Sequence, residues 1–284
     1  MSYLASEFKK HNMPAPQFHF VLGSGISPAL DLLSEKISSL WEELLSIPFQ
    51  SVPHLKTPTV KTHQGFFRYF VHKKTGQSIC FQCGRLHGYE GLSPQEVVKP
   101  VRESYLAGTK NFILTNIGGA LRKELSVGTV ITLKDHINFT GKNPLVGPNP
   151  TDDKGNLLGV RFPDMTEVYD KKTRTQITRE LLSQGLKVEE GIYVGVLGPS
   201  FETPSEIKWF ADGGFSVVGM STVWEAITLR HMGATVSGFS MISNLGSGLN
   251  EGVELTNATM LESVKNYGEK MLQGFFIFCD QELK

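Results

Sequence analysis

Arg85 and His87 lie two positions apart in the segment GRLHGYEG at residues 84–91, which follows an apolar run. In an extended backbone alternate side chains share a face, so Arg85, His87 and Tyr89 would point the same way. The planar guanidinium of arginine suits phosphate, and histidine can donate to an anion or move a proton near neutral pH. Glu90 could hold the ring of His87. The segment therefore predicts an anion site, although a lone histidine is usually structural.

A second candidate anion site is the sequence GSG at residues 23–25, between an expected strand and an expected helix. Glycines let backbone N–H groups approach an anion, and the N-terminus of a following helix adds positive potential. The dinucleotide-binding pattern GxGxxG is not met, since Pro28 stands where its third glycine belongs. Ser24 is therefore a candidate phosphate ligand, and a tight turn is the alternative.

Four more segments place polar residues at the end of an expected strand, which is where ligands of α/β proteins bind. These segments are TNIGGA at 115–120, GPSFET at 198–203, VGMST at 218–222 and the pair Ser243-Asn244. Phe201 could stack on a flat ring whose N–H groups Glu202 accepts, and the amide of Asn244 could read a base. In each segment the alternative is a turn or a helix cap.

The elements that must position these residues alternate between short apolar runs and helical patterns. The apolar runs predict mostly buried strands at residues 18–22, 78–82, 111–115, 130–133, 191–197, 217–219 and 236–242. Strands that alternate with helices predict an α/β fold with a mixed or parallel sheet. We find no linker, repeat or low-complexity tract, so residues 1–284 are expected to form a single domain.

The helices have recognisable start signals. Ser27 before Pro28 predicts an N-cap, and apolar residues at helical spacing extend that helix to about residue 44. Capping boxes begin at Ser93, Thr203 and Thr222, and a long last helix is expected from residue 256 to about residue 279. The Pro/Gly/Asn-rich stretch 141–164 is long for a loop, so we expect a functional or interface element there.

The bulk composition limits the classes of function. The chain has 28 Lys+Arg and 28 Asp+Glu, and this zero net charge argues against a broad nucleic-acid surface. Three cysteines are too few for a disulfide scaffold and fit a reducing cytoplasm, with Cys80 and Cys83 expected in the core. The N-terminus lacks an apolar signal region, and no apolar run reaches transmembrane length, so no membrane contact is expected.

In chain order these segments resemble the trimeric, low-molecular-mass purine nucleoside phosphorylases. The shared motifs, between residues 23 and 244, are GSG, THQG at 62–65, GRxHxYEG, TNxxG, DHIN at 135–138, RFP at 161–163, GPSFET and GMST. The resemblance implies phosphorolysis of 6-oxopurine (deoxy)ribonucleosides such as inosine and guanosine to the base and (deoxy)ribose 1-phosphate. It also implies one domain with a mixed twisted sheet or distorted barrel flanked by helices, a cytoplasmic homotrimer, and phosphate as co-substrate without cofactor or metal.

The resemblance implies a role for particular residues. The phosphate ligands would be Ser24, His63 on a mobile loop, Arg85, His87, Ser221 and the backbone at Asn116 and Ile117. The nucleoside ligands would be Tyr89, Phe201, Glu202, Met220, Asn244, Asn257 and, from the neighbouring subunit, Phe162. His87, Glu202 and Asn244 are expected to be catalytic, because Glu202 would accept from the purine N1–H while Asn244 bonds O6 and N7.

The chain departs from the family pattern at three places. Ile117 replaces a usual small residue after Asn116, which would tighten the sugar–phosphate pocket, and Leu245 stands where vertebrate members commonly have another residue. Asn257 falls where the family usually carries a histidine that meets the ribose 5′-hydroxyl. With the flexible Met260 beside it, Asn257 predicts a loosely read 5′ end. The alternative is that Asn257 caps the last helix.

Three rival functions remain open. A phosphorylase for 5′-methylthio nucleosides, whether methylthioadenosine or methylthioinosine, belongs to the same superfamily, and its adenine-specific members typically carry Asp in place of Asn244. A nucleosidase would use water and would need no anion clamp such as Arg85 and His87. A catalytically silent purine-binding protein would be expected to lose part of the phosphate set. Cleavage measured with and without phosphate separates the three.

Overall fold

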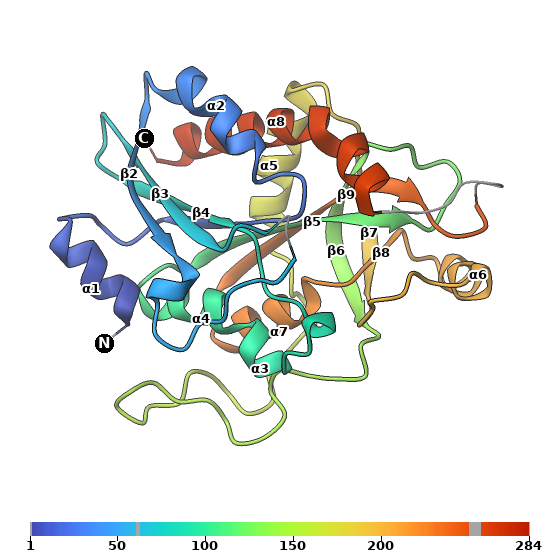
Figure 1. Cartoon of the computed structure of the whole chain (residues 1–284), viewed down its shortest axis with the longest axis horizontal. Helices are drawn as coiled ribbons and strands as arrows, with labels where there is room; N and C mark the ends of the chain where they lie inside the picture. The colour runs from blue at the N-terminus through green and yellow to red at the C-terminus, as the bar shows by residue number, and fades with distance from the viewer. Residues whose placement is uncertain (1, 61–62, 250–256, 284) are drawn as a thin grey trace.

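The computed structural model of the chain describes residues 2–60, 63–249 and 257–283. A mixed sheet forms its centre (Figure 1). The strands are β1 (Phe18–Leu22), β2 (Trp41–Pro48), β3 (Phe66–His72), β4 (Ser78–Cys83), β5 (Asn111–Ala120), β6 (Val130–Asn138), β7 (Val188–Gly195), β8 (Val217–Gly219) and β9 (Thr235–Leu245).

The sheet has the strand order β2-β3-β4-β1-β5-β8-β7-β6-β9. β9 also pairs with β5, so the strands from β5 to β9 close into a barrel while β2, β3, β4 and β1 extend from it. β1 runs parallel to both β4 and β5, whereas β2 and β3 are antiparallel. The expectation of a mixed sheet or distorted barrel is confirmed.

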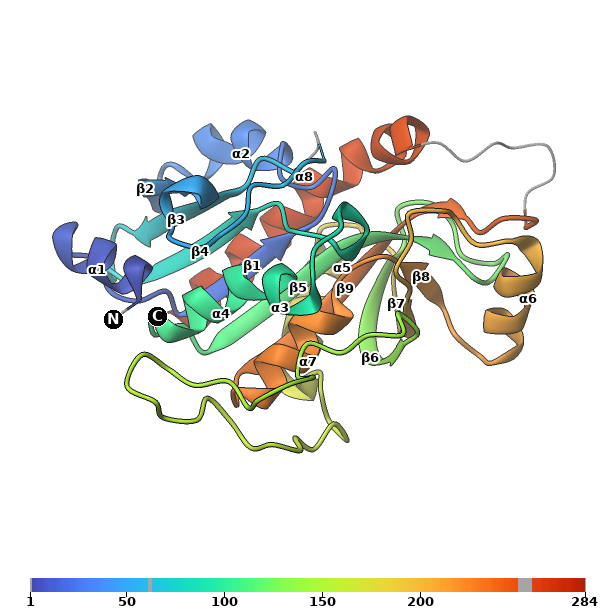
Figure 2. The same cartoon turned by 60° about the horizontal axis from the view of Figure 1, so that its bottom comes forward.

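Helices cover the sheet in two groups. They are α1 (Tyr3–Lys10), α2 (Ala29–Ile37), α3 (Pro94–Val97), α4 (Lys99–Leu106), α5 (Lys171–Ser183), α6 (Pro204–Asp212), α7 (Val223–His231) and α8 (Asn257–Glu282), with 3-10 turns at Phe49–Ser51 and Gly88–Glu90. α2, α5 and α8 lie on one side of the sheet, and α3, α4 and α7 lie on the other (Figures 1 and 2). Each side buries its own apolar cluster, so the central strands β1 and β4 are nearly inaccessible.

The helix expected from residue 27 to 44 is wrong at both ends. Ser27 does not cap it: its hydroxyl makes no hydrogen bond in the described structure, and α2 begins at Ala29 after a series of tight turns. α2 ends at Ile37, and Trp41 instead begins the strand β2. The reason is tertiary. β2 pairs antiparallel with β3, and the indole of Trp41 is buried and donates to Asp280 on α8 at 2.7 Å.

The capping boxes at Ser93 and Thr203 are confirmed, and each precedes a proline in the first turn of its helix. The box expected at Thr222 is wrong, because Thr222 makes no side-chain cap and has φ 70. The stretch 141–164 is a long loop that extends from the body beside α7 (Figure 2). It exposes several apolar side chains, namely Val146, Leu157, Val160 and Phe162.

Candidate active site

A cavity of about 400 Å³ opens where the strand ends of the sheet converge. Every predicted site residue except Phe162 and Asn257 lines it. These residues are Ser24, His63, Arg85, His87, Tyr89, Asn116, Ile117, Phe201, Glu202, Met220, Ser221 and Asn244. The topology explains the convergence: β1 lies parallel between β4 and β5, so the segments that leave their carboxyl ends meet at one edge.

Arg85 forms a buried ion pair with Glu225, on the side of the guanidinium that faces away from the cavity. Its Nε donates to Glu225 Oε1 at 3.2 Å, its Nη2 lies 3.2 Å from Glu225 Oε2, and its Nη1 donates to the carbonyl of Thr115 at 2.6 Å. The two side chains of the ion pair are 2% and 3% exposed. Glu225 was expected to cap α7 and instead fixes the guanidinium at the cavity wall. The capping-box pattern therefore concealed a site residue.

His63 links the segments that carry Ser24 and Arg85. Its Nδ1 accepts from the backbone N–H of Arg85 at 3.3 Å, so Nε2 carries the hydrogen and donates to Ser24 Oγ at 2.8 Å. Burial lowers the pKa of His63 well below its ordinary value, and the nearby His87 and Arg85 lower it further. Gly84 has φ +102, and a Cβ there would lie 2.9 Å from that of His63. Only glycine suits this position.

His87 is oriented by Glu90, as the sequence predicted. Glu90 Oε1 lies 3.3 Å from His87 Nδ1 and accepts the backbone N–H of His87 at 2.8 Å. Burial would raise the pKa of Glu90, but hydrogen bonds from His87 and Thr59 lower it to about 2. Burial lowers the pKa of His87 itself. Because the ionised Glu90 carboxylate can only accept, Nδ1 carries the hydrogen and Nε2 is the nitrogen that gains or loses a proton. The ring also stacks on Tyr89 with centroids 4.6 Å apart.

The part of the cavity that follows β7 and β9 carries a carboxylate and an amide instead of anion-binding groups. Glu202 is half-buried beside the exposed ring of Phe201, and burial raises the pKa of its carboxyl. Asn244 follows Ser243 near the end of β9; its Oδ1 accepts from Ser243 at 2.8 Å and its Nδ2 donates to the carbonyl of Leu245 at 2.9 Å. Each amide atom keeps one further hydrogen-bonding position, which suits a purine edge that offers both a donor and an acceptor.

Two predicted residues lie apart from the cavity lining. Phe162 is 86% exposed on the 141–164 loop. Asn257 begins α8, and its side chain falls outside the described part of the chain, as do Thr62 of the THQG motif and Met260. The sequence pointed to neither Val60 in the cavity wall nor Tyr193, whose hydroxyl accepts the N–H of Ser221 at 3.3 Å. Both are apolar or aromatic residues without a local motif, so no sequence signal distinguishes them from the core.

The remaining expectations concern metals, membranes and thiols. Within residues 2–60, 63–249 and 257–283, no three acidic, histidine or cysteine side chains gather as metal ligands. None of the helices described in these ranges has the length and apolarity to cross a bilayer. Cys80 and Cys83 are unpaired and buried in the core, as expected.

Comparison with known proteins agrees with this geometry. Residues 20–273 match the model of the phosphorylase superfamily. Purine nucleoside phosphorylase 1 of Geobacillus stearothermophilus is 39% identical over 247 residues, which are 86% of this chain and 84% of that protein. The mouse purine nucleoside phosphorylase is 35% identical over 240 residues, 83% of this chain and 78% of its own length.

Solved structures give the same result. The structure of Schistosoma mansoni purine nucleoside phosphorylase in complex with adenosine aligns with a TM-score of 0.82 and 27% identity. The alignment covers 98% of this chain and 95% of that one. Fold, motif order and overall similarity therefore agree, and the chain belongs to the phosphorylase superfamily and, within it, to the purine nucleoside phosphorylases.

Proposed function

We propose that this enzyme uses inorganic phosphate to split 6-oxopurine nucleosides such as inosine and guanosine into the free base and (deoxy)ribose 1-phosphate. One observation carries the proposal: a single cavity is lined both by Arg85, His87 and Ser221 and by Glu202 and Asn244. The first set suits a phosphate, and the second set suits the edge of a purine.

The chemistry requires positioning more than a covalent nucleophile. A phosphate oxygen forms a bond to C1′ of the sugar as the C1′–N9 bond breaks, and the electron pair leaves with the purine. Arg85 and Ser221 hold the phosphate below the sugar, so its attack costs little orientational entropy. Asn244 Nδ2 donates to the acceptors O6 and N7, which stabilises the negative charge that develops on the leaving base, and Glu202 accepts from N1–H and orients the base. The proton of the monohydrogen phosphate passes to the departing base, so the products are the neutral purine and (deoxy)ribose 1-phosphate.

The test follows base release from inosine in phosphate-free buffer and again after phosphate is added. We expect release only with phosphate, together with ribose 1-phosphate as the second product. Equal rates in the two buffers would identify a nucleosidase instead. Binding of hypoxanthine without any turnover would identify a silent purine-binding protein. Inorganic phosphate is the only co-substrate in this proposal, which includes neither a metal nor an organic cofactor.

We further propose a cytoplasmic homotrimer in which Phe162 completes the nucleoside site of a neighbouring subunit. A large aromatic ring that is 86% exposed on a long loop suits burial against another chain. A three-fold contact joins different surfaces of the two subunits, so each subunit can lend a residue to the next. The buried thiols of Cys80, Cys83 and Cys279 fit a reducing compartment.

The rival substrate class is the 5′-methylthio nucleosides, and Asn257 favours it as a second activity. The family resemblance assigns this position to a histidine that meets the ribose 5′-hydroxyl, and the side chain of asparagine is shorter than that of histidine. We expect 5′-deoxyinosine and 5′-methylthioinosine to retain most of the kcat/KM of inosine. Asn257→His should then favour the 5′-hydroxyl by about 0.5–1.5 kcal/mol, the value of one net hydrogen bond. A wild-type loss of orders of magnitude on 5′-deoxyinosine would contradict this role.

A further inference from the structure

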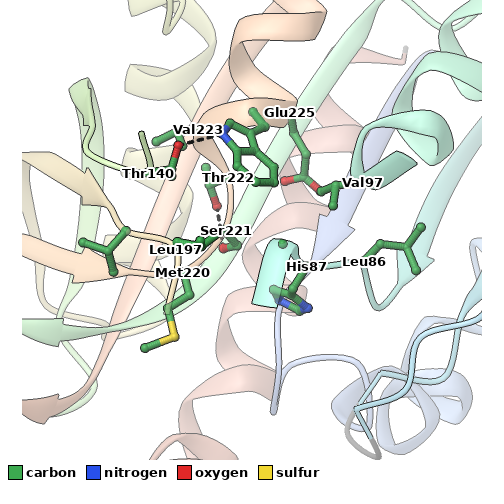
Figure 3. A pocket seen from close by; sticks show the side chains of 13 residues that line it. Leu86, His87, Val97, Thr140, Leu197, Met220, Ser221, Thr222, Val223 and Glu225 are labelled. Atoms are coloured by element: carbon green, nitrogen blue, oxygen red, sulfur yellow. Dashed lines mark hydrogen bonds between the residues drawn. The ribbon is translucent and has the colours of Figure 1, made fainter. Parts of the chain in front are cut away.

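Four polar side chains form a hydrogen-bonded row that runs from the barrel wall to the cavity. Ser240 Oγ on β9 bonds Asn116 Oδ1 on β5 at 2.6 Å, and Asn116 Nδ2 bonds Thr222 Oγ1 at 2.9 Å. Thr222 Oγ1 then lies 3.0 Å from Ser221 Oγ. Figure 3 shows this last link, close to His87 and Met220. Of the four residues, Ser240 lies deepest, at 0% exposure, and is not part of the cavity wall.

The amide of Asn116 gives the row a direction. Its oxygen accepts from Ser240 and its nitrogen donates to Thr222. The reverse orientation would make Ser240 the acceptor and leave its buried hydroxyl hydrogen without an acceptor in the described structure. Thr222 is 2% exposed, and among the described residues Ser221 Oγ at 3.0 Å is the only acceptor within reach of its hydroxyl hydrogen, so Thr222 donates onward to Ser221. Ser221 Oγ thus accepts from Thr222 and turns its own hydrogen toward the cavity.

The backbone at Thr222 gives independent support. Thr222 has φ 70 and ψ −49, and the N–H of Val223 donates to the carbonyl of Ser221 at 2.7 Å. These values describe a γ-turn with positive φ, which is rare and is strained for a β-branched residue. Glycine would relieve the strain but would lack the hydroxyl. A threonine here is consistent with a side chain that the site requires.

We propose that Ser240, Asn116 and Thr222 are positioning residues that keep the Ser221 hydroxyl as a hydrogen-bond donor to phosphate. The inference rests on the proposed function, because it assigns the anion at Ser221 to the co-substrate. Phosphate presents mainly acceptor oxygens, so a hydroxyl whose lone pair faced it would repel it. Ser240 therefore affects phosphate affinity only through Ser221, from which it is separated by the side chains of Asn116 and Thr222.

The test is a double-mutant cycle between Ser240 and Ser221, read as separate KM values for phosphate and inosine. Ser240→Ala should raise the phosphate KM about three- to tenfold, as for the loss of one ordered hydrogen bond, with the inosine KM within about twofold. In the Ser221→Ala background the same substitution should leave the phosphate KM unchanged, because no hydroxyl remains to be oriented. An equal rise in both backgrounds overturns the proposal.

A second pair of variants keeps the test independent of folding defects at Ser240. Thr222→Val removes the hydroxyl at nearly constant volume and should raise the phosphate KM, whereas Thr222→Ser should restore it. Equal phosphate KM values for these two variants would overturn the proposal. If the wild type itself releases base without phosphate, the proposed function fails. If the wild type needs phosphate but Ser240→Ala has the same phosphate KM as the wild type, the proposed function stands and only the positioning role of Ser240, Asn116 and Thr222 is overturned.

Discussion

The Arg85–Glu225 pair illustrates how one residue depends on a second that never reaches the substrate. Taking two charges out of water is costly, and a buried pair is tolerated because each group compensates the other. Glu225 Oε1 accepts from Nε of Arg85, Glu225 Oε2 lies 3.2 Å from Nη2 as an ion-pair contact, and the carbonyl of Thr115 accepts from Nη1. The guanidinium therefore has one orientation before any anion arrives, which lowers the entropic cost of binding.

Glu225→Gln should destabilise the phosphate-free protein by about 3 kcal/mol, because it leaves the buried guanidinium without a counter-charge. Saturating phosphate should raise the stability of the variant by more than it raises that of the wild type, since the anion supplies the missing negative charge. Thermal unfolding with and without phosphate measures both effects. Glu180→Gln is the matched control: that carboxylate is also buried, but its partner Arg179 is 68% exposed. Identical phosphate responses in the two variants would contradict the role of Glu225.

Asn244 and Glu202 should decide which base is accepted. Adenosine presents an unprotonated N1 to the carboxylate and an amino group in place of O6, so buried polar groups lose their partners. We expect a strong preference for inosine over adenosine, which Asn244→Asp narrows by about tenfold or more because a carboxylate accepts from the 6-amino group. Steady-state kcat/KM for the two nucleosides measures this ratio, and Asn143→Asp, outside the cavity, serves as control. Equal wild-type efficiencies would show that the assignment is wrong.

At the scale of elements, the sequence predicted best the strands buried on both faces. β1 and β8 have the expected bounds, because a fully buried strand is a short continuous apolar run. β2 was mistaken for helix since one of its faces is exposed, and its buried Trp41 and Ile47 are set by pairing with β3. Tertiary partners that are distant in sequence leave no local signal, and the partnership of Glu225 with Arg85 escaped prediction for the same reason.

The 141–164 loop should act as an interface element. Phe162→Ala is expected to raise the KM for inosine by about tenfold while the phosphate KM changes little, because the ring contacts the nucleoside end of a neighbouring site. Leu157→Ala, on the same loop and 65% exposed, is the control for a general loss of apolar surface. Light scattering at assay concentration reports the assembly. A fully active monomer would exclude a shared site.

At the scale of the whole molecule, several histidines are removed from water by the fold and are therefore held neutral. Burial lowers the pKa of His19 and of His136 to about 4, and it lowers the pKa of His63 well below 6.5. His19 lies against Phe67 and Phe112 far from any compensating charge, and its Nε2 bonds the amide of Gln82 at 3.1 Å. Such groups couple the stability of the fold to pH.

The protein should lose stability as the pH falls from about 6.5 toward 4. In this window the unfolded chain binds protons on these histidines while the folded chain does not, so the unfolded state gains free energy of protonation. Near pH 5, His19 and His136 should each contribute about 2 kcal/mol to the loss. Urea unfolding in phosphate-free buffer at steps between pH 7.5 and 4.5 measures the slope. His19→Phe should lower stability at neutral pH, because Gln82 Oε1 loses its donor while Gln82 Nε2 keeps its bond to the Gly84 carbonyl. The same variant should reduce the pH dependence of the unfolding free energy by the equivalent of about one proton. A wild-type stability that stayed constant or rose between pH 6.5 and 5 would mean that these rings are protonated inside the fold.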